Sequence, residues 1–206
     1  MKYIKAYLVL AIFLFLLISC NSGYNKQDGK WVWVSYDEAA GKRVSKIDHH
    51  DFESFEILDN KNYARDKKSV FYIGRKIKNA DPQSFEVLNN GYSKDYNNVF
   101  LDAETIVFAD SDSFKLLEFP YSKDRKNIFC GTLPLEISNN EVSEFTVTNK
   151  NELMSNSKST ILLSHFIKIN PKYQWLDTLN IDGVIVGEWA TGKTKERKFK
   201  GFKEVK

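Results

Sequence analysis

Apolar residues are distributed along the chain in two ways. Ala6–Ile18 is a run of 13 uninterrupted apolar residues, and it follows a start that carries Lys2 and Lys5. After residue 20 the apolar positions mostly come in runs of about three to five, separated by polar turn-forming residues. Short strands joined by frequent turns, without a sustained 3.6-residue period, predict an all-β protein.

The short runs recur with a period of 29 residues, except that the first two Phe-containing runs are 30 residues apart. The first element of each unit is such a run after D-x-x-S. These runs are FEIL, FEVL and FKLL, beginning at Phe55, Phe85 and Phe114. Further positions recur at the same spacing: Tyr63, Tyr92 and Tyr121; Asp66, Asp95 and Asp124; Phe71, Phe100 and Phe129. Such self-similarity is typical of repeat architectures, in which each unit buries its apolar face against its neighbours.

Each unit is predicted to contain a capped turn, a short strand, a second short extended segment that begins at the repeat tyrosine, another turn and a buried strand. The runs VFY, VFL and IFC are apolar at successive positions, which indicates strands buried on both faces between layers. We expect tandem β-meander or solenoid-like repeats over residues 30–137, three of them full. A degenerate first copy begins near Trp31, where WVWV replaces the later strand.

The C-terminal region, residues 138–206, departs from this pattern. Thr160–Ile169 is a strongly apolar run that we expect to form a strand. Gly183–Trp189 and Thr194–Phe202 are predicted to be two strands around an Ala190–Lys193 hairpin turn. The predicted β-hairpin would cap the array.

The chain start has the features of an export signal. The Ala6–Ile18 run is shorter than the roughly 20 residues that span a bilayer, and it matches a secretory signal core. Leu17-Ile18-Ser19-Cys20 resembles a bacterial lipobox, which implies cleavage after residue 19 and acyl chains, such as palmitate, on Cys20. An uncleaved signal anchor is the alternative. Residues 20–29 are polar and are predicted to form a tether.

The repeats resemble a known family. YARDKKSVFY, YSKDYNNVFL and YSKDRKNIFC, beginning at Tyr63, Tyr92 and Tyr121, are similar to the DKNYY repeat of bacterial envelope proteins. The resemblance covers about half of the chain, and Leu101 and Cys130 depart from it by replacing the last aromatic residue. It implies no activity and no catalytic residue. Together with the lipobox, it places the protein in the cell envelope, lipid-anchored on the extracytoplasmic side at the outer membrane or cell surface.

Charge narrows the range of partners. The 30 basic and 27 acidic residues give a formal net charge of +3, which is too balanced for bulk-charge binding of nucleic acid. If Cys20 carries lipid, Cys130 has no disulfide partner within the chain.

Several motifs suggest chemistry but have simpler structural explanations. Gly187–Thr194 satisfies the phosphate-loop pattern, yet the twelve residues that follow leave no room for its helix and next strand, so no nucleotide site is expected. Asp48-His49-His50-Asp51 carries four side chains able to bind a metal ion, with His165 as a candidate further ligand. Because neighbouring side chains on a strand point to opposite faces, the segment is predicted to be a surface turn and not a metal site. Cys130, at the position of Tyr72 and Leu101, is expected to be a core residue and not a nucleophile.

Three further patterns also resemble functional motifs. Asp110-Ser-Asp112 begins like a calcium loop but lacks its later glycine and glutamate. Ser164-His165 are neighbours whose side chains diverge on a strand, so they predict no triad. Trp31 and Trp33 share one strand face and either cap the array or form a platform for sugar rings. We expect no metal, no cofactor and no catalytic residue.

The sequence therefore favours a non-catalytic binding or scaffolding module for envelope proteins. Recognition of envelope glycan through Trp31, Trp33 or the repeat tyrosines is the alternative. An envelope hydrolase comes third, because no acid, base and nucleophile assemble in the pattern.

Overall fold

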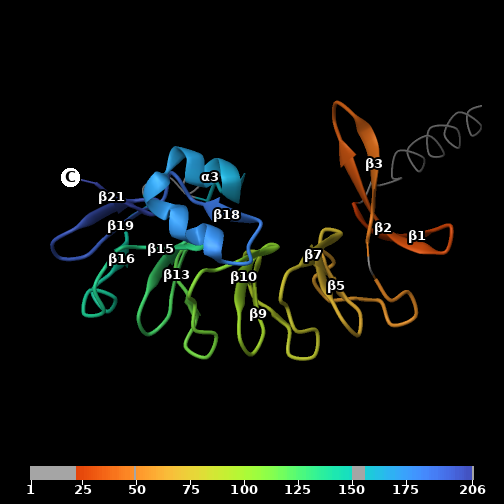
Figure 1. The fold of residues 1–206 in the computed structure, drawn as a ribbon, viewed down its shortest axis with the longest axis horizontal. Helices are drawn as coiled ribbons and strands as arrows, with labels where there is room; N and C mark the ends of the chain where they lie inside the picture. Colours follow the sequence, from red (N-terminus) through yellow and green to blue (C-terminus); the bar gives the residue numbers. More distant parts are fainter. Residues whose placement is uncertain (1–21, 49, 150–155, 206) are drawn as a thin grey trace, which may run out of the picture.

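The protein is an elongated stack of small antiparallel sheets with one short helical insertion (Figure 1). The computed structural model describes residues 22–48, 50–149 and 156–205. The predicted signal peptide and the lipid-attachment residue Cys20 lie outside these ranges. The expectation of an all-β repeat protein is confirmed.

Four sheets share one plan of four short strands, and we call them units 1 to 4; the strands are consecutive in units 1 to 3 and interrupted by an insertion in unit 4. Unit 1 contains β4 (Glu56–Ile57), β5 (Tyr63–Arg65), β6 (Val70–Tyr72) and β7 (Arg75–Ile77). Unit 2 contains β8 (Glu86–Val87), β9 (Tyr92–Lys94), β10 (Val99–Leu101) and β11 (Glu104–Thr105). Unit 3 contains β12 (Lys115–Leu116), β13 (Tyr121–Lys123), β14 (Ile128–Cys130) and β15 (Leu133–Pro134).

The units stack face to face, which explains why their strands are apolar on both sides. Phe71 packs toward the preceding sheet with Trp33, whereas Tyr63 and Val70 pack toward Phe100 of unit 2. Between units 1 and 2, for example, Tyr63 contacts Phe85 of the next unit at a 5.8 Å ring separation, and Phe85 contacts Phe100 at 6.2 Å. Tilted aromatic pairs of this kind each add about 0.5–1.5 kcal/mol beyond burial of their area.

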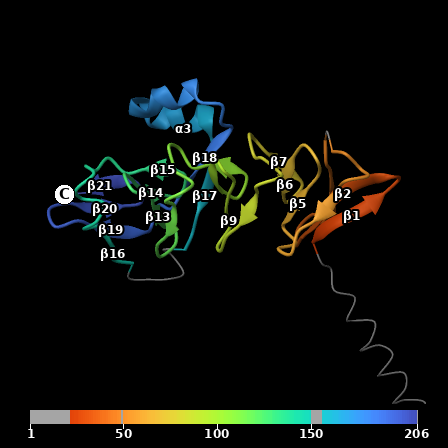
Figure 2. The ribbon, with the colours of Figure 1, turned by 90° about the horizontal axis from the view of Figure 1, so that it is seen from below.

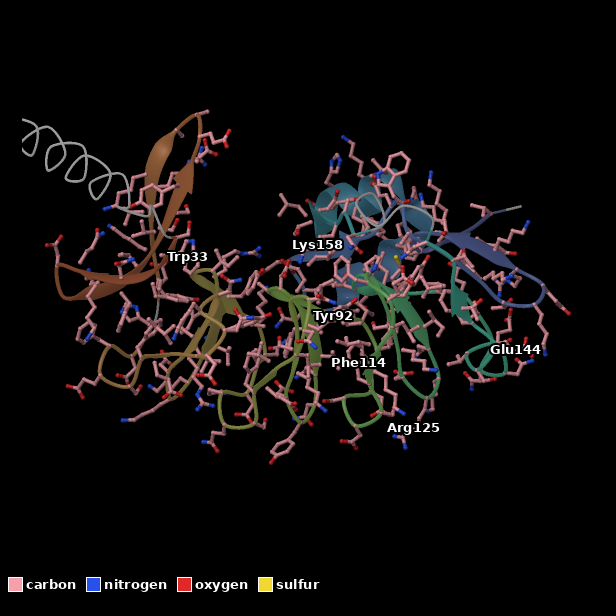
Figure 3. All side chains as sticks on the ribbon, turned by 180° about the vertical axis from the view of Figure 1, so that it is seen from behind. Trp33, Tyr92, Phe114, Arg125, Glu144 and Lys158 are labelled. Atoms are coloured by element: carbon pink, nitrogen blue, oxygen red, sulfur yellow. The ribbon has the colours of Figure 1, made fainter. Side chains whose placement is uncertain are left out.

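The aromatic ladder repeats at every junction of the stack, and Figure 3 shows Tyr92 and Phe114 inside it. The four tyrosine–phenylalanine contacts are Tyr24–Phe55, Tyr63–Phe85, Tyr92–Phe114 and Tyr121–Phe145. The tyrosine hydroxyls also donate to backbone oxygens one unit on, at Asn62, Gly91, Pro120 and Gly201. Each tyrosine therefore links two neighbouring sheets through its ring and its hydroxyl.

A three-stranded sheet begins the stack and contains β1 (Gly23–Gln27), β2 (Lys30–Asp37) and β3 (Gly41–Lys46). The prediction that residues 20–29 form a tether is therefore wrong from Gly23 onward. Tyr24 is buried beneath Trp33 and Phe55, where it takes the place of the repeat tyrosine. That burial, together with a full β1–β2 ladder, orders this polar segment.

Unit 4 closes the stack and is split in sequence. It contains β16 (Thr146–Val147), β19 (Thr191–Lys193), β20 (Lys198–Lys200) and β21 (Lys203–Val205). Phe145 and Phe199 occupy the repeat phenylalanine positions, 6.1 Å apart. The expectation that residues 138–206 leave the repeat is thus corrected. The hairpin turn is also displaced, because Thr191–Lys193 is a strand and the turn follows it at Thr194–Arg197.

The insertion within unit 4 contains β17 (Ser159–Leu162), α3 (Leu163–Ile169), the 3-10 helix η1 (Pro171–Thr178) and β18 (Gly183–Val186). Thr160–Ile169 was predicted to be a strand, but its second half is helical. Leu163, Phe166 and Ile167 recur with helical spacing and are buried in the core of the C-terminal half. Figures 1 and 2 show α3 and η1 on one side of the stack.

The part of the insertion from η1 to the start of β18 contacts units 3, 2 and 1 in turn. Lys172 pairs with Glu136 at 2.8 Å, Trp175 stacks on Phe108 at 5.4 Å, and Lys78 pairs with Asp182 at 2.6 Å. Lys78, Val107 and Glu136 are 29 residues apart, so these contacts fall near equivalent places. Between them, β18 packs on β11 and β15. Within the described ranges, no helix has the length and apolar character needed to cross a membrane.

Candidate functional site

The hairpin turn of each full unit is organised by one buried aspartate. Asp124 Oδ1 accepts hydrogen bonds from the backbone N–H groups of Lys126 and Asn127 at 2.7 and 2.6 Å. Its Oδ2 accepts from the N–H of Asp110 at 3.0 Å, which ties the turn to the D-x-x-S loop. Asp66 and Asp95 do the same in units 1 and 2. These aspartates therefore have a structural role.

The D-x-x-S loops, which are hydrogen-bonded to these hairpin turns, carry a second set of aspartates. A hydrogen bond from Ser84 Oγ lowers the pKa of Asp81, and Ser113 Oγ and Arg125 lower that of Asp110. Backbone N–H donation from Ser54 lowers the pKa of Asp51. Arg125 lies in the hairpin turn of unit 3 and is labelled in Figure 3. The carboxylates stay ionised at neutral pH while their hydrogen bonds shape the loops.

An open edge of the stack is formed by the first two strands of each unit, and it is the candidate binding surface. The insertion covers the last strands of units 2 and 3, at the other end of the sheets. Cross-strand pairs on the open edge change in charge along the stack: Glu56 faces Arg65, Glu86 faces Lys94, Lys115 faces Lys123, and Thr146 faces Lys193.

The charge on this edge therefore rises from units 1 and 2 to units 3 and 4. Arg65 pairs with Glu56, and Lys94 pairs with Glu86 at 3.9 Å. Among the described residues, Lys115, Lys123 and Lys193 have no ion-pair partner. Such unpaired cations make the later units the attractive end for an acidic partner.

A shallow groove crosses the open edge between units 1 and 2, and is lined by Glu56, Ile57, Arg65, Phe85 and Val87 among others. Arg65 donates to the carbonyl of Pro82 in the next unit at 3.0 Å. Lys94 repeats this reach toward Ser111 at 3.5 Å. The long cationic side chains thus bridge units and lie over the groove between them.

Trp31 and Trp33, the predicted ligand platform, lie within the first junction of the stack. Trp33 is 6% exposed and meets Tyr24 edge-on at 4.9 Å. Trp31 stacks on Phe55 at 4.8 Å, and Lys26 Nζ lies 4.8 Å from its ring centroid. These contacts cover the indole faces, so the geometry favours a capping role over an open platform.

His50 and its neighbours are held by the backbone. His50 Nδ1 lies 2.7 Å from the carbonyl oxygen of Ile47, and Nε2 accepts from the N–H of Trp31 at 3.3 Å. His49 lies outside the described residues. Where the chain is described, no three His, Cys, Asp or Glu side chains are grouped to hold a metal ion. His165 is an exposed residue of α3, and Ser164 beside it is also exposed.

The phosphate-loop pattern at Gly187–Thr194 has no phosphate-loop architecture. The segment turns after β18 and enters β19, and the next element is the antiparallel strand β20 where a nucleotide site requires a helix. Gly192 lies inside β19, and a Cβ there would meet Phe145 Cζ at 2.2 Å. Its small size therefore accommodates the ring of the aromatic ladder.

Cys130 lies in the core. Its side chain is 0% exposed, and its thiol donates to the carbonyl oxygen of Gly187 at 3.6 Å. Burial raises the pKa of this thiol to about 12. The thiolate that nucleophilic catalysis requires is therefore strongly disfavoured. Asp110 is likewise occupied, since Ser113 and Arg125 both donate to its Oδ2.

Sequence reasoning missed the parts of unit 4 and the role of Tyr24. Glu141-x-x-Glu144-Phe145 corresponds to D-x-x-S-F, and Thr194 through Phe199 corresponds to D-x-x-N-[VI]-F, but the 43 residues from 148 to 190 separate β16 from β19. A search that allowed such a gap would have found the phenylalanine spacing within each half.

Comparison with known proteins gives one match. The family model described as "DKNYY family" matches residues 5–104 and 92–204. The second match extends through both halves of unit 4, well beyond the half of the chain that the sequence resemblance covered. Neither the comparison with curated proteins nor that with solved structures finds a match.

Proposed function

The chain belongs to the DKNYY family, and we propose that it works as a membrane-anchored, non-catalytic scaffold that binds protein partners at the bacterial cell envelope. The observation that carries this proposal is the open edge, a repeated surface that no described segment covers. Repeat stacks commonly use such extended surfaces for binding. Lipid on Cys20 would hold the stack at the membrane on the extracytoplasmic side, at the outer membrane or cell surface.

The charge of the open edge supports a protein partner with acidic side chains. Lys115 and Lys123 face each other across β12 and β13, and neither forms an ion pair with a described residue. Like charges directly opposite each other cost stability unless an anionic group lies between them. A partner carboxylate at this place would relieve the repulsion. Two residues with catalytic potential are engaged elsewhere: Cys130 is buried, and both His50 nitrogens contact the backbone.

Site-specific photo-crosslinking in the native cell tests the proposal. A photoreactive residue at Lys115 should capture a discrete protein, and Lys123→Glu should abolish that product. A photoreactive residue at Lys168, exposed on α3, is the matched position outside the open edge. Equal capture at both positions, or capture unaffected by Lys123→Glu, would contradict binding at the open edge.

Glycan recognition, the alternative, stays a prediction. An envelope-glycan array probed with wild type and Trp31→Ala tests it directly. Binding that is lost in Trp31→Ala would replace a protein partner with a glycan.

A further inference from the structure

A second hollow lies at the end of the stack, away from the open edge, and we call it the end groove. Phe166, Val186 and Phe202 form its apolar floor, and Ile169, Lys200 and Val205 line its rim. The groove lies between the insertion and the last two strands of unit 4. It therefore combines surfaces from both parts of the C-terminal half.

Apolar side chains at this groove lack the cover that the repeat gives them elsewhere. Val205 pairs with Lys198 as Ile77 pairs with Val70, but Val205 is 40% exposed while Ile77 is 1% exposed. Ile169 is 56% exposed. In units 1 to 3 the following sheet supplies this contact, whereas no sheet formed by the described residues packs on the outer face of unit 4.

Cations replace the apolar residues on the outer face of unit 4. Lys198 stands where units 1 to 3 have Val70, Val99 and Ile128, and Lys200 stands where they have Tyr72, Leu101 and Cys130. In the described part of the chain Lys198, Lys200 and Lys203 form no ion pair, whereas Glu204 pairs with Arg197 at 2.8 Å.

These charges discriminate between occupants. Two copies meeting end to end would bring their lysines together, so self-stacking is disfavoured. Glu188 is the acidic residue on the rim, and it leaves the groove with excess positive charge. An anionic occupant with apolar side chains is the complementary one.

The chain itself shows which kind of segment this side of the stack accepts. All four residues of β18 are buried, and its Ile185 exchanges hydrogen bonds with Thr132 of unit 3, both at 2.9 Å. Asp182 precedes β18 and Glu188 follows it. Thr132 follows the turn glycine of unit 3 as Phe202 follows Gly201 in unit 4. The end groove thus includes the unit 4 counterpart of a place that an extended, acid-flanked apolar segment already fills.

We propose that the end groove binds an extended segment of a partner protein, with branched apolar side chains between acidic residues. β21 is the last strand of its sheet, so such a segment is able to pair with its outer edge by strand addition. Its apolar side chains cover Phe202, Val205 and Ile169, and its carboxylates meet Lys200 and Lys203. This site is separate from the open edge.

A labelled peptide with the sequence of residues 182–188, DGVIVGE, is the probe. Fluorescence anisotropy with the full-length protein should show saturable binding. Lys200→Glu combined with Lys203→Glu should weaken it by about tenfold or more, because both rim charges reverse. Ile169→Asp should weaken it as well. Lys67→Glu combined with Lys68→Glu, the same charge change on an exposed turn of unit 1, should leave it unchanged, and circular dichroism should confirm that every variant is folded.

Other results would overturn the proposal. These are no saturable binding of the peptide to wild type, or equal binding by the Lys200/Lys203 variant. Binding of phosphatidylglycerol vesicles that depends on Lys200 and Lys203, without peptide binding, would assign the surface to a membrane. None of these outcomes changes the expected crosslinking from Lys115. Failure of this proposal is therefore distinguishable from failure of the proposed scaffold function.

Discussion

At the scale of single residues, the repeat is held by side chains that each satisfy several neighbours. A repeat aspartate accepts three backbone hydrogen bonds, and a repeat tyrosine both packs on a ring and donates to the next unit. One position on the second strand of each unit faces a ring of the aromatic ladder and must hold a small residue. The equivalent residues in units 1 to 4 are Ala64, Ser93, Ser122 and Gly192.

Gly192 and Lys193 are adjacent in β19 and should respond in opposite ways to alanine. Gly192→Ala should lower the free energy of unfolding by about 1–3 kcal/mol, because the new Cβ forces Phe145 from its packed position. Lys193→Ala should change it by less than about 0.5 kcal/mol, since the lysine is exposed and unpaired. Urea denaturation measures both. A large loss of stability in Lys193→Ala together with no loss in Gly192→Ala would contradict the strand assignment. Calorimetric titration of the wild type with magnesium-ATP should show no binding.

Cys130 should be unreactive while the protein is folded. A thiol with no exposed surface and a pKa raised to about 12 presents almost no thiolate at pH 8. A thiol reagent such as dithionitrobenzoate should label the Cys20→Ser chain only on addition of denaturant. Rapid labelling under native conditions would show that unit 3 opens at this position.

At the scale of elements, the insertion depends on the turns over which it passes. Gly131 has φ +63° and stands so close to β18 that a Cβ would lie 2.0 Å from the carbonyl oxygen of Ile185. Gly29 has a similar φ of +70° with nothing within 4 Å. The two glycines share a left-handed backbone conformation, but only Gly131 lies against the insertion. Comparing alanine substitutions at the two positions therefore distinguishes the effect of conformation from the effect of contact with β18.

Gly131→Ala should destabilise the protein clearly more than Gly29→Ala. Both substitutions carry the left-handed penalty of about 1 kcal/mol, and Gly131→Ala also displaces β18. Thermal unfolding of the two variants measures the difference. Equal shifts in Tm would mean that β18 is not held against unit 3.

Glu141 joins the two halves of the split unit. It accepts hydrogen bonds from the backbone N–H and the hydroxyl of Ser138, and from Thr194 and Arg197 across the insertion. Hydrogen bonding by Ser138, reinforced by Arg197, lowers its pKa from 4.5 to about 2. Because the folded-state pKa is depressed, its contribution is present above pH 4.5 and is lost as the pH falls toward 2.

Glu141→Gln should therefore reduce stability at pH 7 and flatten the acid dependence between pH 4.5 and 2. Denaturation midpoints across that range give the comparison. Glu53→Gln, an exposed carboxylate in the corresponding loop of unit 1, should leave stability at pH 7 within about 0.5 kcal/mol of wild type. An unchanged acid limb in Glu141→Gln would mean that the two halves are joined by other contacts.

At the scale of the whole molecule, the two ends of the stack are unlike its middle. All six residues of β3 are exposed and the strand lies at a sheet edge, whereas β14 is fully buried between units. Stability in repeat stacks is approximately a sum of nearest-neighbour interfaces, so elements with one neighbour open first.

Hydrogen–deuterium exchange should follow this order. Amides of β3 should exchange within the earliest time points, and those of β10 and β14 should be the slowest. The peptide that contains β18 should resemble β14, because it is buried against unit 3. Uniform protection from β3 to β14 would indicate that the stack opens only as one unit.

The sequence by itself determined the repeat. The spacing of Tyr, Asp and Phe gave the unit length, the turn positions and the burial of strands on both faces, because each unit repeats the same local chemistry at the same interval. Tertiary structure alone decided how the ends are made. Tyr24 joins the stack from a polar segment because Trp33 and Phe55 cover it. Unit 4 forms from segments that are distant in sequence because Phe145 and Phe199 meet across the insertion. Local patterns cannot contain either contact, since the partner that stabilises each one is brought near only by folding.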